Sequence, residues 1–325
     1  MTSLPRIVPL SEIEKVVQLP GFHEKLVQGI ADGFVQLQKS EFCAAPIQTL
    51  GAPPLAPFVA NCENYAAQTC VKSGYFANNP YYVIKVASGG YPLPNAGNMQ
   101  VYSQSTGRLV ALLLDEGLLT ELRTAAWSAL ILNLWLKQQT FTTDPIAKIG
   151  MLGTGVQARY QLDALQHETT CRHVVVYGRT AANVDAYQHD MEAKGWTVEA
   201  ADDPHDLLEH CDVVVTTTPA RTPVLRATSS SMRTRLLICI GADAVGKTEL
   251  GSSLVQHAVL RVADSVAQSR QRGEFQGCSD TILDLGDWIV QVQQQQSTIE
   301  GLMIADSSGV ALQDCIIAQM VYESL

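Results

Sequence analysis

The segment KIGMLGTGVQA, residues 148–158, constrains the fold of this chain more than any other feature. Its apolar start, residues 148–152, predicts a short buried strand, and helical periodicity resumes from Gln157 to Gln166. The turn between them, Gly153-Thr154-Gly155-Val156-Gln157-Ala158, matches the pattern G-x-G-x-x-A. The first glycine permits a tight turn, the second lets the backbone approach a pyrophosphate, and Ala158 lets the helix pack on its strand. This context predicts dinucleotide binding by residues 153–157; the alternative is a glycine turn in an unrelated α/β protein.

Alternating strands and helices follow this turn and predict an α/β fold with a Rossmann-type doubly wound parallel sheet. Such sheets bind ligands at the carboxyl ends of their strands. We therefore assign residues 124–300 to an NAD(P)-binding domain. Its strands are expected at 173–177, 197–201, 212–218, 236–242 and 258–264, and a helix at 181–194.

A different pattern precedes this domain and predicts an α+β domain with a mostly antiparallel sheet. A capping box from Ser11 to Glu14 and apolar residues at helical spacing from Phe22 to Leu37 predict two helices. An apolar, helical tail over residues 304–322 is expected to return to this domain, which therefore comprises 1–123 and 301–325. Its other expected elements are extended segments at 42–60, strands at 81–87, 99–103 and 109–114, a loop at 88–94 and a buried helix at 120–138.

The composition disfavours several classes of function. The chain has 325 residues and a formal net charge of −10, with no run of Lys or Arg, which argues against a nucleic-acid partner or an acidic membrane surface. No signal-peptide pattern or membrane-spanning segment is visible, so we expect a cytoplasmic protein. The 8 Cys lack a C-x-x-C pattern and the 7 His lack a metal-ligand spacing, which favours reduced thiols and no metal site.

Six motifs together indicate a protein family. They are Lys85 in a strand, LTELRTAA at 119–126, GTGVQA at 153–158, GADAVGKTEL at 241–250, Gly273-Glu274, and SGVALQD at 308–314. In this combination the chain strongly resembles the ornithine cyclodeaminase/mu-crystallin family over nearly its whole length. The resemblance implies a homodimer in which the N-terminal domain and the C-terminal tail bind substrate and dimerise. It also implies chemistry at the carbon between an amine or imine nitrogen and a carboxylate.

Chemistry at such a carbon requires a cation for the carboxylate and a proton source for the nitrogen. Arg123, where a helix begins, offers a bidentate grip on a carboxylate, or alternatively an ion pair that closes the domain. Lys85 lies in an uncharged strand whose alternation favours a solvated face, whereas the resemblance implies an active-site ammonium. Asp243 follows a strand at its carboxyl end, and we expect its small apolar neighbours to desolvate it partly and favour a proton-donating form; a helix N-cap is the alternative. We predict that all three are catalytic and that they face one cleft between the domains.

Two further substrate contacts follow from the resemblance. The family commonly has an arginine in the early extended segment, as P-x-R, that helps to bind the substrate carboxylate. Gln48 stands at that place here, and its neutral amide can hydrogen-bond a carboxylate without supplying charge. Gly309 is the second expected contact, although the segment 305–309 departs from the mu-crystallin-like F-K-S-x-G form. These departures leave the identity of the substrate open.

The choice of cofactor depends on the end of the second strand of the nucleotide-binding domain. NAD-preferring folds place an Asp or Glu there to accept a hydrogen bond from the ribose 2′-hydroxyl. Arg179 and Thr180 follow that strand here, and they suit a 2′-phosphate. We therefore favour NADP(H), with NAD(H) possible, and we expect Thr217 to lie near the nicotinamide.

Together these features predict an NADP(H)-dependent reductase of a small imine or ketimine carboxylate, of the pyrroline-2-carboxylate or piperideine-2-carboxylate type, that yields the L-amino acid. One alternative is an ornithine cyclodeaminase-like lyase that uses NAD+ catalytically. Another is a catalytically weak, mu-crystallin-like binding protein. The expected partners are a small amino-acid-derived substrate and a second copy of the chain.

Overall fold

The computed structural model describes residues 4–51, 68–90, 93–139, 146–227, 232–294 and 298–325, and the chain divides into two compact units. Unit 1 comprises residues 1–123 and 310–325, and unit 2 comprises residues 124–309. The predicted class is confirmed, because unit 2 contains a doubly wound parallel sheet and unit 1 a mostly antiparallel one. The expected extended segment at 52–60 and residues 91–92 of the expected loop lie outside the described residues.

The sheet of unit 1 has the order β1-β7-β6-β5-β4-β2, and β3 also pairs with β4. β1 runs parallel to β7, and the other pairs are antiparallel. Strand β5 extends to Gly90, where we expected a loop, because Ser88 keeps its pairing with both neighbouring strands. The strands are β1 (Arg6–Val8), β2 (Phe42–Ala44), β3 (Gln48–Gly51), β4 (Gln68–Phe76), β5 (Tyr81–Gly90), β6 (Leu93–Ser103) and β7 (Leu109–Leu113).

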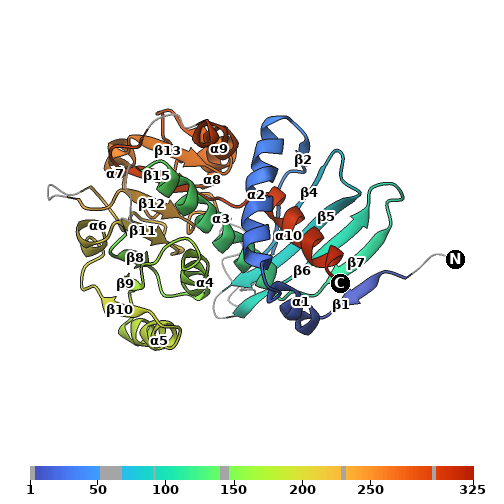
Figure 1. Ribbon diagram of the computed structural model, residues 1–325, viewed down its shortest axis with the longest axis horizontal. Helices are drawn as coiled ribbons and strands as arrows, with labels where there is room; N and C mark the ends of the chain where they lie inside the picture. Colours follow the sequence, from blue (N-terminus) through green and yellow to red (C-terminus); the bar gives the residue numbers. More distant parts are fainter. Residues whose placement is uncertain (1–3, 52–67, 91–92, 140–145, 228–231, 295–297) are drawn as a thin grey trace. The chain divides into compact units, whose positions relative to one another are not determined.

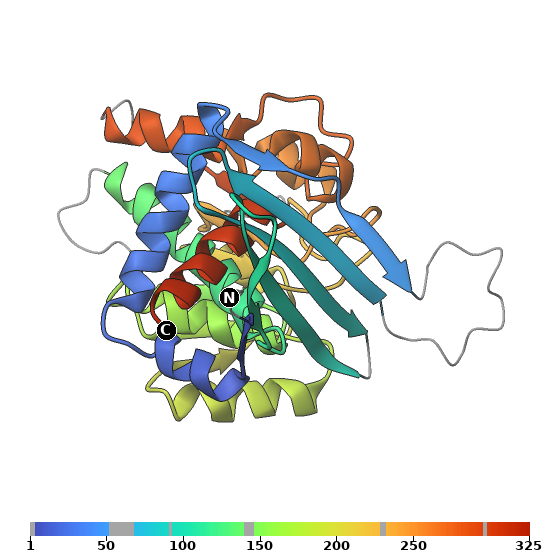
Figure 2. The ribbon, with the colours of Figure 1, turned by 90° about the vertical axis from the view of Figure 1, so that its right-hand side faces the viewer.

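Helix α10 packs on one face of this sheet against β4, β5 and β6, and α2 lies beside α10 (Figures 1 and 2). Phe22, Leu26, Ile30 and Phe34 form the buried stripe of α2, as their spacing predicted. Helix α1 begins one residue before the expected capping box, with Pro9 as its N-cap and no side-chain cap. The helices are α1 (Leu10–Val17), α2 (Phe22–Gln38) and α10 (Ala311–Glu323); α3 (Leu118–Lys137) begins in unit 1 and continues in unit 2.

The described residues of unit 2 form a sheet of eight parallel strands in the order β10-β9-β8-β11-β12-β15-β13-β14. The chain passes outward from β8 through β9 to β10 and then returns to β11 on the other side of β8, so the topological switch point lies between β8 and β11. The strands are β8 (Ile149–Leu152), β9 (His173–Tyr177), β10 (Thr197–Ala200), β11 (Val213–Thr216), β12 (Leu236–Cys239), β13 (Leu260–Ala263), β14 (Leu283–Asp284) and β15 (Met303–Asp306).

Strand β15 corrects the expectation of a helix that starts near residue 304. Met303–Asp306 is buried throughout and pairs with β12 and β13, so its apolar residues belong to a central strand rather than to the tail helix. A short apolar run fits either structure, and here the neighbouring strands decide. The tail helix α10 begins at Ala311, and residues 301–309 consequently pack in unit 2.

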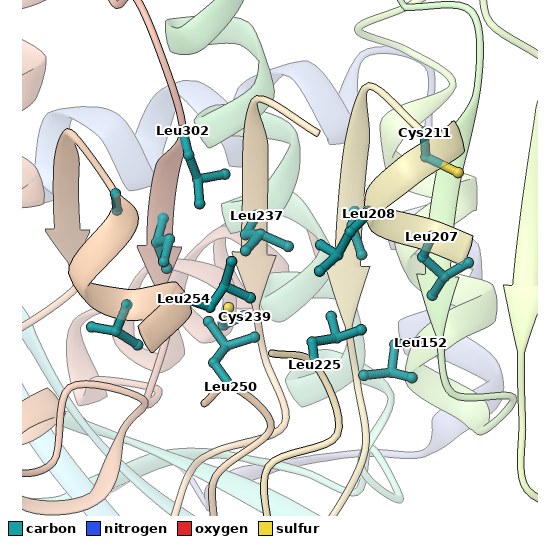
Figure 3. Packing of buried hydrophobic residues seen from close by; sticks show 14 of the residues in the cluster. Leu152, Leu207, Leu208, Cys211, Leu225, Leu237, Cys239, Leu250, Leu254 and Leu302 are labelled. Carbon is teal, nitrogen blue, oxygen red and sulfur yellow. The ribbon is translucent and has the colours of Figure 1, made fainter. Parts of the chain in front are cut away.

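Leucine side chains from strands and helices form the core on one side of this parallel sheet (Figure 3). Leu237, Leu254 and Leu302 are among its members, and Cys239 is buried with them. The helices of unit 2 are α4 (Val156–Leu165), α5 (Ala181–Glu192), α6 (Asp206–His210), α7 (Ser252–His257), α8 (Val266–Arg272) and α9 (Leu285–Gln293).

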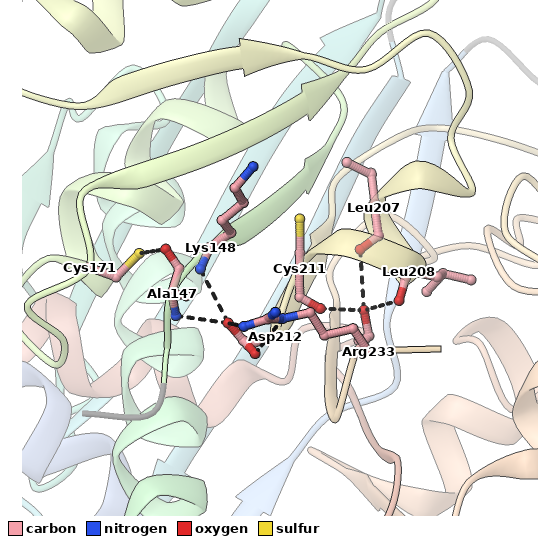
Figure 4. A network of polar contacts seen from close by, with 9 residues as sticks. Ala147, Lys148, Cys171, Leu207, Leu208, Cys211, Asp212 and Arg233 are labelled. Atoms are coloured by element: carbon pink, nitrogen blue, oxygen red, sulfur yellow. Dashed lines mark hydrogen bonds and ion pairs between the residues drawn. The ribbon is translucent and has the colours of Figure 1, made fainter. Parts of the chain in front are cut away.

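A polar network fixes the amino ends of three adjacent strands (Figure 4). The buried carboxylate of Asp212, just before β11, accepts from the backbone N–H groups of Ala147 (2.8 Å) and Lys148 (3.2 Å), just before β8. Arg233, just before β12, donates to the same carboxylate over 2.9 and 3.2 Å. Side chains thus brace this edge of the sheet, and the opposite edge carries the glycine turn.

Candidate functional site

The C-terminal helix of unit 1 brings a buried carboxylate to two of the predicted catalytic residues. Oδ1 of Asp314, on α10, lies 2.9 Å from Nζ of Lys85 on β5 and 3.1 Å from Nε of Arg123 on α3. All three residues are at most 5% exposed. Lys85 points into the unit because it alternates with half-buried Ile84 and Val86, so the solvated face that alternation alone favoured is wrong.

The neighbouring Gln313 also faces Arg123, whose Nη1 donates to its Oε1 over 2.6 Å. Gln313 is fully buried, and its Nε2 has no hydrogen-bond partner among the described residues. A buried donor without an acceptor is costly and typical of a binding site. Guanidinium, ammonium and amide donors are therefore concentrated at one place in unit 1, as an anionic ligand requires.

Burial and charge shift the protonation of this cluster in opposite directions. Burial lowers the pKa of Lys85 to about 8, although Asp314 opposes the effect. Burial alone would raise the pKa of Asp314, but Lys85 and Arg123 outweigh it and hold that pKa below its usual value. The carboxylate is therefore ionised at neutral pH, and Lys85 loses its proton in a range close to physiological pH.

Sequence reasoning missed a third cation, Lys72. It lies on β4, a strand that we did not predict, directly opposite Lys85 in the antiparallel register. Lys72 is buried, and its charge contributes to the lowered pKa of both Lys85 and Asp314. Lys72 alternates with half-buried Val71 and Ser73 in the same way as Lys85 alternates with its neighbours. This similarity was the signal in the sequence that could have indicated a second buried lysine.

Gln48 does not join these cations, which corrects its predicted place in the substrate site. It pairs with Val71, so its side chain lies on the face of the sheet opposite to Lys72 and Lys85. It is also exposed. The residue that replaces the expected arginine thus occupies the wrong face of the sheet to contact the buried cluster.

The glycine turn of unit 2 lies at the switch point between β8 and β11. Gly153 has a φ of 112°, and a Cβ on it would lie 2.6 Å from Oγ1 of Thr217, so glycine is required on both counts. A Cβ on Gly155 would meet no atom within 4 Å, and α4 starts directly after it without a side-chain cap. The first N–H groups of α4 are therefore suited to a pyrophosphate.

Arg159 supports the turn from inside α4. Its Nη1 donates to the carbonyl oxygens of Thr154 (2.7 Å) and Gly155 (3.2 Å), and Asp190 accepts from its Nε over 2.8 Å. These bonds orient the turn without using its N–H groups. Val156 is exposed at the start of the helix, and Gln157 accepts a hydrogen bond from Gln161.

The other predicted cofactor contacts surround this turn. Arg179 and Thr180 are exposed after the carboxyl end of β9, next to β8 in the sheet. Thr154 lies against the same end, because a Cβ on Gly178 would be 2.8 Å from its Cγ2. Thr217 follows β11 and donates from Oγ1 to the carbonyl oxygen of Leu152 over 3.1 Å.

Asp243 differs from its prediction in environment. Its side chain is 56% exposed and lies 2.6 Å from Nζ of Lys247, so the small neighbours do not desolvate it. The N-cap alternative is also wrong, because α7 begins at Ser252 with Gly251 as its N-cap. Asp243 belongs to unit 2, and Lys85 and Arg123 belong to unit 1. Their convergence on one cleft stays a prediction.

Two buried glutamates from the quoted motifs, to which we had assigned no role, hold the segment that carries Asp243. Glu249 accepts from Thr216 Oγ1 (2.6 Å), Thr218 N (2.6 Å) and Gly241 N (3.0 Å). Glu274 accepts from the backbone N–H groups of Glu249 (2.6 Å) and Leu250 (3.1 Å). Burial raises the pKa of both carboxyl groups. The two glutamates thus fix both ends of the 241–250 segment to the sheet.

Gly309 is the last residue of unit 2 and lies beside the buried Asp264. With a φ of 77°, it donates its N–H to Asp264 (2.7 Å), and its carbonyl oxygen accepts from Gln268 (3.0 Å). Both of its backbone polar groups are therefore engaged within unit 2. Its role as a substrate contact stays a prediction.

Within the residues that the structure describes, no group of three or more His, Cys, Asp and Glu side chains is placed to hold a metal ion. In the same part of the chain, no helix is both long and apolar enough to cross a membrane.

The fold and these clusters define a protein with a Rossmann-type unit and a second unit that contains a buried cluster of cationic side chains around Asp314. A family model for the ornithine cyclodeaminase/mu-crystallin family matches residues 88–325, and the chain belongs to this family. A Sinorhizobium fredii protein named as the uncharacterized cyclodeaminase y4tK is 32% identical, over 78% of this chain and 79% of its own length. The putative dehydrogenase RB0419 of Rhizobium meliloti is 28% identical, over 98% of this chain and 94% of its own length.

Solved structures share the fold over nearly the whole chain. An archaeal alanine dehydrogenase dimer with bound NAD aligns with a TM-score of 0.80 and 22% identity, over 98% of this chain and 95% of the other. The Paracoccus denitrificans iminosuccinate reductase in complex with NAD+ aligns with a TM-score of 0.79 and 24% identity, over 98% and 96%. The Thermococcus litoralis pyrroline-2-carboxylate reductase with NADH and L-proline aligns with a TM-score of 0.80 and 20% identity, over 98% and 97%.

The buried ion cluster makes Asp314 a sensitive position for stability. We expect Asp314→Asn to lower the free energy of unfolding by about 3 kcal/mol, because Lys85 and Arg123 lose their shared counter-ion in a buried site. Glu323→Gln removes an exposed carboxylate from the same helix and should change it by less than about 0.5 kcal/mol. Urea unfolding measures both, and equal values for the two variants would contradict the assignment.

Proposed function

We propose that this protein is an NAD(P)H-dependent reductase of small imine carboxylates. The observation that carries the proposal is the buried cluster of Lys85 and Arg123, with the orphan amide donor of Gln313 beside it. Buried cations with spare donors suit a carboxylate ligand. The named activities of three structural neighbours, which act on alanine, iminosuccinate and pyrroline-2-carboxylate, agree with a substrate that bears a carboxylate next to C–N.

The residues of unit 2 fit a nicotinamide dinucleotide. Its pyrophosphate would be held by the N–H groups that follow Gly155, with Gly153 permitting the turn and Gly155 the close approach. Thr217, at the switch point, would contact the nicotinamide end, and Arg179 and Thr180 would contact the adenosine ribose. When bound, the reduced cofactor supplies the hydride that the imine carbon receives.

The residues of unit 1 would bind and orient the substrate. Arg123 and Lys85 hold its carboxylate and so fix the position of the imine carbon, while Asp314 keeps both cations in place. Gln313 supplies a neutral donor through Nε2. Burial of the cluster excludes water, and this strengthens each charged contact.

Asp243 is the proposed acid/base group for the substrate nitrogen. An imine nitrogen gains a proton when the carbon gains hydride, and an amine loses one in the reverse direction. Asp243 is exposed within its unit, so a cationic nitrogen of the substrate can reach its carboxylate in competition with Lys247. In this proposal its carboxylate binds the imine in its protonated form and, in the reverse direction, takes the proton that the substrate ammonium loses.

An activity assay tests the proposal. It combines the purified protein with NADPH or NADH and with pyrroline-2-carboxylate or piperideine-2-carboxylate. We expect loss of the reduced-nicotinamide absorbance and formation of the L-amino acid. Arg123→Lys should lower kcat/KM by on the order of a hundredfold, because lysine cannot reproduce the bidentate contact. Tight cofactor binding without turnover on a panel of imines would instead indicate a mu-crystallin-like binding protein.

A cyclodeaminase is the second candidate, favoured by the similarity to y4tK and to the L-lysine cyclodeaminase of Streptomyces rapamycinicus, which is 25% identical over 94% of this chain and 88% of its own length. Such a lyase would release ammonia from ornithine or lysine with no net change in NAD+. Ammonia release in the absence of net cofactor turnover therefore distinguishes it from the reductase.

For the cofactor we propose a preference for NADP(H). Arg179→Ala should weaken NADPH binding about tenfold, because the ribose 2′-phosphate loses a charged partner, and should leave NADH binding nearly unchanged. Arg108→Ala removes an exposed arginine from unit 1 and serves as the matched control. Equal effects of Arg179→Ala on the two cofactors, measured by fluorescence titration, would contradict the assignment.

Substrate binding should weaken as Lys85 loses its proton. The ammonium form prevails below pH 8, so the inhibition constant of a non-reacting cyclic carboxylate, such as pyrrole-2-carboxylate, should be lowest there and rise as the pH increases through about 8. Lys85→Met should bind the inhibitor more weakly at all pH values and remove this increase. An unchanged pH profile in the variant would show that another group is responsible.

Two further properties belong to the proposal. A homodimer is supported by the dimeric alanine dehydrogenase among the structural neighbours. A reducing, cytoplasmic location is supported by the free thiols of the described cysteines 43, 70, 171, 211, 239, 278 and 315.

A further inference from the structure

The loop after β11 is the part of unit 2 that the proposed function assigns to the nicotinamide, and it is bonded to the end of β8. The backbone N–H of Thr217 donates to the carbonyl oxygen of Leu152 over 2.9 Å, and Oγ1 of Thr217 donates to the same oxygen over 3.1 Å. Leu152 ends β8, directly before Gly153. The residue that would contact the nicotinamide is therefore fixed to the turn that would hold the pyrophosphate.

A single buried carboxylate holds the two residues that flank Thr217. Oε2 of Glu249 accepts from Oγ1 of Thr216 over 2.6 Å, and Oε1 accepts from the backbone N–H of Thr218 over 2.6 Å. Glu249 and Thr216 are fully buried. Hydrogen bonds in such a site of low dielectric are strong, so the carboxylate restrains the loop on both sides of Thr217.

The same carboxylate also holds the start of the segment that carries Asp243. Oε2 of Glu249 accepts from the backbone N–H of Gly241 over 3.0 Å. A Cβ on Gly241 would lie 2.1 Å from the carbonyl oxygen of Thr218 and 2.4 Å from Oε2 of Glu249, so this close approach requires glycine. Glu249 thus joins the loop after β11 to the loop after β12, in which Asp243 follows Gly241 by two residues.

The donors around Glu249 fit a carboxylate and not an amide. One backbone N–H points at each oxygen, and an N–H group cannot accept a hydrogen bond, so both oxygens must act as acceptors. Burial raises the pKa of Glu249 to about 7, and the donors limit this rise. A glutamine has a single acceptor oxygen, so it would leave either Thr218 or Gly241 without its bond.

We propose that Glu249 is a positioning residue for hydride transfer. It acts through two other groups, because it sets the place of the nicotinamide through the loop after β11 and the place of the Asp243 carboxylate through Gly241. Hydride transfer requires the donor carbon, the imine carbon and the group that holds the imine nitrogen to share one geometry, and a displacement of about 1 Å can lower the rate on the order of a hundredfold. The inference rests on the proposed function and adds a residue to its machinery.

Kinetics of Glu249→Gln test this inference. We expect kcat for imine reduction to fall about tenfold to a hundredfold, and the KM of the cofactor to change less than about threefold, because the pyrophosphate turn keeps its own contacts. The primary isotope effect on kcat should also increase when the cofactor carries deuterium at both C4 positions, because hydride transfer becomes slower relative to product release. A residue with only a structural role would not change this isotope effect.

Asp212→Asn is the matched control. Asp212 is also a buried carboxylate that accepts from two backbone N–H groups, but it lies at the opposite edge of the same sheet. This variant should unfold at a lower temperature than the wild type, with kcat within about threefold and an unchanged isotope effect. Equal effects of Glu249→Gln and Asp212→Asn on kcat and on the isotope effect would overturn the inference.

A second pair of variants decides the question if Glu249→Gln does not fold. Thr216→Val removes the O–H donor to Glu249 and keeps the shape of the side chain, whereas Thr216→Ser keeps the donor. We expect the valine variant to lower kcat at least about threefold and to increase the isotope effect, and the serine variant to restore both. Identical values for the two variants would contradict the inference.

A measurement without substrate separates this inference from the proposed function. The fluorescence lifetime of bound NADH or NADPH depends on the surroundings of the nicotinamide ring. If the wild type reduces no imine, a lifetime that changes in Glu249→Gln and not in Asp212→Asn would refute the reductase and retain the positioning of the nicotinamide, and an unchanged lifetime would overturn both. Imine reduction by the wild type, with kcat and isotope effect unaltered in Glu249→Gln, would retain the reductase and overturn the inference.

Discussion

The buried carboxylate of Asp314 is the interaction on which unit 1 depends. It is 229 residues away from Lys85 in sequence, yet the two side chains form one ion pair with almost no exposure. A buried ion pair has high desolvation costs and stabilises a fold weakly compared with apolar packing. Its value here is geometric, because one carboxylate oxygen fixes an ammonium from the sheet and a guanidinium from a helix with respect to each other. Substrate binding by these cations would therefore be preorganised.

Unit 2 uses the two edges of its parallel sheet in different ways. At the amino edge, Asp212 and Arg233 tie the starts of β8, β11 and β12 together. At the carboxyl edge, α4 begins after Gly155 without a side-chain cap, so its first N–H groups are not used by a capping side chain. Buried Glu249 and Glu274 fix the segment that carries Asp243. Rigid support thus surrounds the edge that faces ligands in folds of this kind.

Much of this arrangement could be predicted from the sequence, because local patterns determined it. The glycine turn and the alternation of strands and helices after residue 148 rest on residues that are close together in the chain. For Lys85 the local alternation favoured a solvated face, and only the family resemblance indicated an active-site role. The misses have a common cause: they depend on pairing between distant segments. Strand β15 resembles a helix start until β12 and β13 flank it, and Lys72 resembles a solvated lysine until β5 places Lys85 opposite it. Gln48 was misplaced because a strand register decides its face, and Asp243 because the exposure of a loop side chain depends on packing that its neighbours in sequence do not specify.

The return of α10 to unit 1 also sets an order of events during synthesis. Unit 2 is continuous in sequence, so all of its described strands are synthesised before residues 311–323. Until then, the face of the first sheet that α10 covers has neither its apolar cover nor the counter-ion of Lys85. Chains generally fold domain by domain from the N-terminus. In this protein the part that is translated first is completed last, and its nascent sheet must stay free of aggregation while an entire second domain is synthesised.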